Sequence, residues 1–106
     1  MRQLTTELLE EIKKRIIEKV HPEKIILFGS HAWGKPEESS DLDLFVILPH
    51  SNEPSYRRAR VIYEVLHGIK YPIDVVVQTH DEVERNKLVR TSLVSNILSK
   101  GKVIYG

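Results

Sequence analysis

The sequence contains no cysteine, and this absence excludes several kinds of function. Without thiols the chain cannot form disulfide bonds, thiolate metal centres or a cysteine nucleophile. It also has no apolar run near the 18 residues that a membrane-spanning helix requires. The N-terminal stretch MRQLTTELLEEIKKR has no apolar signal-peptide core, so we expect a cytoplasmic protein.

The sequence also lacks an excess of charge of either sign. Sixteen Lys and Arg against fifteen Asp and Glu give a net charge of +1, so bulk charge predicts neither a nucleic-acid nor a membrane partner. A hydrophobic fraction of 41% and a charged fraction of 29% are typical of a soluble globular protein. We therefore expect a single domain over residues 1–106.

Hydrophobic periodicity predicts alternating helices and strands. Apolar residues at helical spacing predict three helices, over 4–20, 54–67 and about 89–99. Short apolar runs predict three strands and a final short one, at 24–29, 41–48, 71–78 and 102–105. Residues 30–40 offer at most one helical turn and then a polar loop. This order predicts an α/β (α+β) fold with helices packed on a small central sheet.

Two carboxylates in the second predicted strand are unusual for a buried strand. Asp41 and Asp43 are two residues apart, so their side chains point to the same face, about 7 Å apart. At about 4 Å two such charges repel by roughly 4 kcal/mol, against a total stability of about 5–15 kcal/mol. Either solvent or a bound cation must relieve this repulsion. Oxygen ligands without nearby His or Cys favour a hard cation, Mg²⁺ or Mn²⁺.

A third carboxylate lies in the third predicted strand. Asp74 stands in IDVVV among apolar residues, where an unpaired charge is costly. If this strand pairs with the second one, Asp74 can project toward the face of Asp41 and Asp43. Three carboxylates in one patch would hold two divalent ions, which activate an attacking oxygen and stabilise a leaving one.

The turn after the first predicted strand has the features of a phosphate site. Gly29 ends the strand, and Ser30 begins a tight turn that presents backbone N–H groups and a hydroxyl to an anion. Gly29 has no Cβ, so a phosphate can approach its backbone closely. Gly34 then ends the turn, and the loop that follows it leads to Asp41. A phosphate cradle and paired carboxylates on adjacent strands together describe a nucleoside triphosphate site.

Taken together, these motifs resemble those of a known protein family. The chain resembles the polymerase-β-type nucleotidyltransferases, and closely the minimal nucleotidyltransferases of bacteria and archaea. The resemblance lies in the succession of GSHAWG, SDLDLFVI and IDVVV. The family pattern is a Gly-Ser turn, an Asp-x-Asp strand and a third Asp on a neighbouring strand. The matching residues, in order and type, are Gly29, Ser30, Asp41, Asp43 and Asp74. One position departs from the family, since Trp33 stands where an Arg is frequent and cannot make a charged phosphate contact.

The resemblance implies a polymerase-β-like fold with a mixed sheet, and it assigns roles to the matching residues. Ser30 and the amides after Gly29 would hold the β and γ phosphates of the nucleotide. Asp41 and Asp43 would hold Mg²⁺, and Asp74 would help bind a second ion and take the proton of the acceptor hydroxyl. The implied reaction is nucleotidyl transfer with loss of pyrophosphate, with ATP as the default donor.

The resemblance also implies a partner. Minimal nucleotidyltransferases often pair with a small helical protein of the HEPN type and act as the antitoxin of this RNase toxin. The acceptor would then be a tyrosine of the partner, a step that rests on family analogy. Two alternatives stay open, namely a non-catalytic subunit that masks its partner by contact and a transferase that modifies a small molecule. Self-association of the chain is also compatible with the sequence.

The remaining polar and aromatic residues have plainer interpretations. Five histidines lack metal-ligand spacing and are interpreted as structural or surface residues: His21, His31, His50, His67 and His80. The basic cluster RRAR at 57–60 is either a solvated helix face or a patch that faces a partner or RNA. Trp33 and Tyr56 can stack on a base or pack at the rim of the fold.

Overall fold

A computed structural model of the chain describes residues 4–33 and 41–106. Its elements, in chain order, are α1 (Thr6–Val20), β1 (Lys24–Phe28), α2 (Ser30–Trp33), β2 (Leu42–Leu48), α3 (Ser55–Val65), β3 (Ile73–Thr79), α4 (His80–Asn86), α5 (Leu93–Lys100) and β4 (Lys102–Tyr105). The predicted loop that includes Gly34, and the side chain of Trp33, lie outside the described part of the chain.

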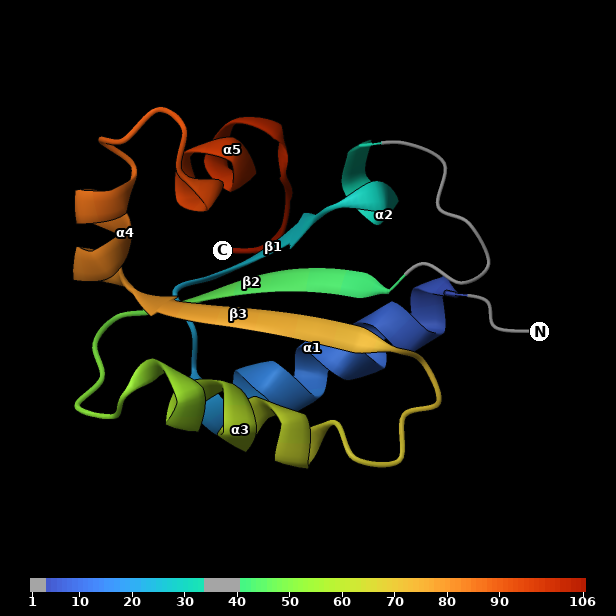
Figure 1. Cartoon of the computed structure of the whole chain (residues 1–106). Helices are drawn as coiled ribbons and strands as arrows, with labels where there is room; N and C mark the ends of the chain where they lie inside the picture. The colour runs from blue at the N-terminus through green and yellow to red at the C-terminus, as the bar shows by residue number, and fades with distance from the viewer. Residues whose placement is uncertain (1–3, 34–40) are drawn as a thin grey trace.

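The four strands form one mixed sheet in the order β3-β2-β1-β4, with helices on both faces (Figure 1). β1 runs antiparallel to β2 and to β4, whereas β2 and β3 run parallel. The parallel pair needs a crossover connection, and α3 provides it. The prediction of a small mixed sheet flanked by helices is therefore confirmed.

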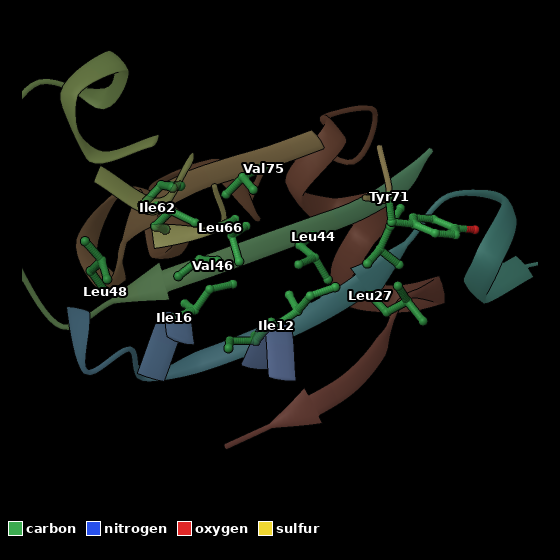
Figure 2. Packing of buried hydrophobic residues seen from close by; sticks show 13 residues of the cluster. Ile12, Ile16, Leu27, Leu44, Val46, Leu48, Ile62, Leu66, Tyr71 and Val75 are labelled. Atoms are coloured by element: carbon green, nitrogen blue, oxygen red, sulfur yellow. The ribbon is translucent and has the colours of Figure 1, made fainter. Parts of the chain in front are cut away.

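Alternation along β2 divides the hydrophobic core into two layers. Leu42, Leu44 and Val46 pack on one face of the sheet with side chains from α1 and α3, as Figure 2 shows for part of this layer. Phe45 and Ile47 pack on the other face with residues of α4 and α5. Because a fully buried side chain of this size contributes about 1.5–3 kcal/mol, both layers anchor β2 at the centre of the molecule.

The first helix begins and ends at residues that suit those positions. The hydroxyl of Thr5 accepts a hydrogen bond from the N–H of Leu8 at 3.0 Å, so α1 starts one residue after this N-cap. At the other end His21 adopts a left-handed conformation, with φ of 47°, and its N–H bonds to the carbonyl of Ile17. The predicted end of the helix at His21 is confirmed.

The chain after β3 differs from the prediction, because α4 is an additional helix. Thr79 and Glu82 form a capping box, in which the Thr79 hydroxyl accepts from the Glu82 N–H and the Glu82 carboxylate accepts from the Thr79 N–H. The next helix starts at Leu93 instead of about residue 89, since Ser92 is its N-cap. These two caps place a turn where the periodicity predicted the start of one longer helix.

The other boundaries shift by one or two residues. α3 ends at Val65 rather than at residue 67, and Gly68 follows it in a left-handed turn with φ of 92°. β3 begins at Ile73, after Pro72, whose ring nitrogen lacks the hydrogen that a sheet ladder requires. In the described ranges, no helix combines the length and the apolar character needed to cross a membrane.

Candidate functional site

Gly29 brings the turn after β1 directly against Asp43. The antiparallel register places Phe28 opposite Asp43, so the turn starts beside that carboxylate. Gly29 has a φ of 78°, a left-handed conformation that favours glycine. A Cβ atom at this position would overlap Asp43 Oδ2 and lie 3.1 Å from Cγ. The backbone conformation and the close contact both require glycine here.

The parallel strands β2 and β3 hold two carboxylates next to each other. Their register places Asp43 opposite Asp74, and the N–H of Leu42 donates to the carbonyl of Pro72 at 2.9 Å at the start of this ladder. Residues opposite each other in a sheet point to the same face, so both carboxylates lie on the α4 and α5 side. Asp41 is exposed and directly precedes β2.

The surroundings of Asp43 raise the pKa of its carboxyl group. Partial burial is the main cause, and the negative charges of Asp74 and Asp41 act in the same direction, while His31 acts in the opposite one. A raised pKa means that the charged form of Asp43 is disfavoured in the protein alone. A cation in this patch would favour the charged form and lower the pKa again.

The donor atoms of this patch suit a hard cation. Asp41, Asp43 and Asp74 offer only oxygen ligands, which Mg²⁺ and Mn²⁺ prefer. Within residues 4–33 and 41–106, no three His, Asp or Glu side chains lie close enough to form a metal cluster on their own. Mg²⁺ is often held by one or two carboxylates, and water and substrate phosphates complete its shell. The patch therefore fits a metal that binds together with a nucleotide.

Ser30 lies beside the carboxylate patch, at the first residue of α2. It is exposed to solvent, and the single turn it opens is closed by the Ala32 N–H, which donates to the Gly29 carbonyl at 3.0 Å. The structure thus brings the predicted phosphate turn and the predicted carboxylates to the same end of β1, β2 and β3.

A contact between His31 and Tyr71 was not predicted from the sequence. The hydroxyl of Tyr71 lies 3.3 Å from His31 Nε2, and the two rings meet edge to face with their centroids 5.9 Å apart. Tyr71 is buried and its ring is directed toward α2 (Figure 2). The pair connects α2 to the segment that leads into Asp74. The two residues are 40 positions apart, so no local pattern could reveal their contact.

The basic cluster on α3 is less uniform than the sequence suggested. The side chain of Arg58 is only 9% exposed and donates to Glu82 at 2.6 Å. Arg57 and Arg60 are exposed; Arg57 stands 3.7 Å from Glu53, which precedes α3, and Arg60 stands 3.8 Å from Glu64. The interpretation as a solvated helix face therefore applies to Arg57 and Arg60, whereas Arg58 joins α3 to α4.

Comparison with known proteins places this geometry in a family. The family model described as nucleotidyltransferase domain matches residues 9–104. Two relatives from Methanocaldococcus jannaschii carry the names "Putative protein adenylyltransferase MJ1379" and "Putative protein adenylyltransferase MJ0141". The first is 36% identical over 63 residues, which are 59% of this chain and 63% of that protein. The second is 26% identical over 97 residues, or 90% of this chain and 93% of that protein.

A solved structure agrees with the fold. The crystal structure of a putative nucleotidyltransferase from Sulfolobus solfataricus superposes with a TM-score of 0.53, at 21% identity, over 80% of this chain and 85% of that one. At this identity the likeness supports the fold alone. The family match covers nearly the whole chain and includes the Gly29 turn and all three carboxylates. The chain belongs to the nucleotidyltransferase domain family.

Proposed function

We propose that this protein transfers AMP from ATP to a hydroxyl group of another protein. The observation that carries the proposal is the register of the sheet, which places Asp43 opposite Asp74 and next to the Gly29 turn. Such an arrangement offers a phosphate cradle and an acidic patch at one end of the sheet. The names of the two archaeal relatives support a protein acceptor.

The reaction breaks one phosphoanhydride bond and forms one phosphoester bond. The acceptor oxygen attacks the α-phosphorus of ATP, and the bond between that phosphorus and the bridging oxygen of pyrophosphate breaks. Asp74 takes the proton of the acceptor hydroxyl, and pyrophosphate leaves with its bonding electron pair. The products are an AMP ester of the acceptor and free pyrophosphate.

Each residue of the site has its own role in this reaction. Ser30 and the backbone amides after Gly29 hold the β and γ phosphates, so that the α-phosphorus lies over the acidic patch. Asp43 and Asp74, which the register places opposite each other, would hold Mg²⁺, with Asp41 as a third ligand that must move closer and Mn²⁺ as a substitute. When bound, the metal supplies positive charge that neutralises the phosphates and the leaving group. The raised pKa of Asp43, caused first by burial and then by Asp74 and Asp41, supports a cation at this place.

We propose a tyrosine of a partner protein as the acceptor, with an HEPN-type RNase toxin as that partner. The support for this identity is the resemblance of the sequence motifs to minimal nucleotidyltransferases. Two other functions predict different results in the same assay. A subunit that only masks its partner would neutralise toxicity without transfer, and a small-molecule transferase would label no protein.

The test is transfer of label from ATP with ³²P at the α position to a co-expressed helical partner, with Mg²⁺ present. We expect label from the α position and none from the γ position, because AMP and not phosphate is transferred. Asp74→Asn should lower the rate about 10²–10⁴-fold, the usual contribution of a general base. Asp81→Asn is the matched control, since Asp81 is an exposed residue of α4.

Three results would contradict the proposal. Label from the γ position would indicate a kinase, and unchanged transfer by Asp43→Asn would separate the acidic patch from catalysis. Neutralisation of the partner by Asp43→Asn at the wild-type level, without label transfer, would favour the masking subunit.

A further inference from the structure

Among the described strands, β3 lies at the edge of the sheet and pairs only with β2, as Figure 1 shows. The carbonyl of Pro72 accepts from Leu42, so residues 72, 74, 76 and 78 turn their backbone groups toward β2. The residues between them, from Ile73 to Thr79, turn their N–H and C=O groups away from the sheet. An edge of this kind is able to pair with another strand.

Two of the outward N–H groups are already occupied by side chains. The N–H of Val75 donates to the hydroxyl of Tyr63, and the N–H of Thr79 donates to the carboxylate of Glu82, each at 2.8 Å. Val77 lies between them. In the described part of the chain no side chain pairs with its outward N–H, so this group is available to an added strand.

A groove of about 390 Å³ follows this free stretch of β3. Its floor is formed by residues 75–78, and its walls come from α3 and α4. The wall residues are Ser55, Tyr56 and Ala59 on α3, with Glu82 and Asn86 on α4. Asn86 donates to the side chain of Gln78 at 3.0 Å, which joins α4 to the floor. We call this groove the β3 slot.

We propose that the β3 slot binds an extended segment of the acceptor protein as a fifth strand and thereby brings its hydroxyl to Asp74. This inference rests on the proposed function. The floor begins at Val75, one residue after Asp74. In paired strands, opposite residues on the same face have their Cβ atoms about 4.5–5.5 Å apart. A Ser or Thr opposite Asp74, or a Tyr at the diagonal position of the same face, therefore reaches its carboxylate.

The chemistry of the slot identifies a polypeptide backbone as the occupant. In the described part of the chain, the outward N–H of Val77 and the outward C=O groups of Val75 and Val77 are left for pairing, and they are complementary to the same groups of another extended chain. Tyr56, which is 67% exposed on the α3 wall, offers an apolar surface for alternate side chains of that segment. A second copy of this protein that paired through its own β3 would bring its α3 and α4 against the α3 and α4 that already line the slot. An extended segment without helices avoids this conflict.

The test uses an array of 12-residue synthetic peptides, each with one tyrosine, incubated with the full chain, Mg²⁺ and α-labelled ATP. A peptide that accepts label should also slow hydrogen exchange at the Val77 amide. Ser55→Arg and Ala59→Arg place a long side chain in the slot, and we expect at least about a tenfold loss of kcat/KM for the peptide. KM for ATP should stay unchanged in both. Asn52→Arg adds the same charge in an exposed loop outside the slot and should behave as wild type.

Binding and transfer can be separated in this design. Asp74→Asn should keep the peptide-dependent protection of Val77 while it loses transfer. Protection without any transfer by the wild-type chain would overturn the proposed function and leave the slot supported. Equal transfer by both Arg variants, or no protection of Val77 by any peptide, would overturn the slot. Protection of Val77 in a dimer without peptide would assign the edge to a second copy and overturn it as well.

Discussion

Replacement of Gly29 by alanine tests how closely the phosphate turn and Asp43 depend on each other. Two costs are expected. A residue with a Cβ atom at the left-handed φ of 78° loses about 1–2 kcal/mol. The new Cβ also overlaps Asp43 Oδ2, and displacement of that side chain from its rotamer costs about 0.5–1.5 kcal/mol. Together they predict a loss of about 1.5–3.5 kcal/mol of unfolding free energy.

Gly68 provides the matched control for this prediction. It also has a left-handed φ, of 92°, but a Cβ built on it meets no atom within 4 Å. Gly68→Ala should therefore show only the backbone cost of about 1–2 kcal/mol. In an Asp43→Ala background the overlap disappears, and Gly29→Ala should then cost as much as Gly68→Ala.

The measurement is the free energy of unfolding from urea titrations followed by circular dichroism, in a double-mutant cycle. The coupling between Gly29→Ala and Asp43→Ala should be about 0.5–1.5 kcal/mol. If Gly29→Ala costs no more than Gly68→Ala, or if its excess cost persists without the Asp43 carboxylate, the close contact does not explain the glycine.

Three further predictions concern charged residues. Asp43→Asn should stabilise the metal-free protein at pH 7, because a raised pKa destabilises the charged form, and the gain over wild type should shrink in urea titrations near pH 4. Glu82→Gln should cost about 1.5–3 kcal/mol at pH 7. The hydrogen bond from Arg58 is the main cause of the lowered Glu82 pKa, so this contribution is present above the ordinary Glu pKa and is lost as the pH falls through the lowered value. The hydrogen bond to Glu23 raises the pKa of His80. The contribution of this pair to stability is complete below about pH 6.5 and is lost as the pH rises through the raised pKa. NMR titration of the His80 ring, with His80→Gln as reference, will show the raised pKa.

The central part of the fold could be predicted because its signals are local. Asp43 and Asp74 each stand in a strongly apolar run, and alternation along a strand decides which neighbours share their face. The pairing of the third strand with the second was a condition of the prediction, and the parallel register of β2 and β3 meets it. The positions of Gly29 and both carboxylates follow from these patterns, whereas their roles in catalysis stay predictions.

The missed features have physical reasons. α4 buries only one apolar side chain, Val83, so seven residues gave too little periodicity. Its capping box at Thr79 and Glu82 was the available signal. The contact of His31 with Tyr71 depends on how far the α3 crossover carries the chain before β3, and no short pattern contains that distance.

The two-layer core has a consequence for the order in which the protein is made. Once residue 79 has left the ribosome, the chain contains all of β1, β2 and β3, and with them Gly29, Asp43 and Asp74. The face of these strands that bears Phe45 and Ile47 is still exposed, because Val94 and Ile97, which pack on it, belong to α5. We expect a nascent chain of this length to expose apolar surface next to the acidic residues until α4 and α5 cover it.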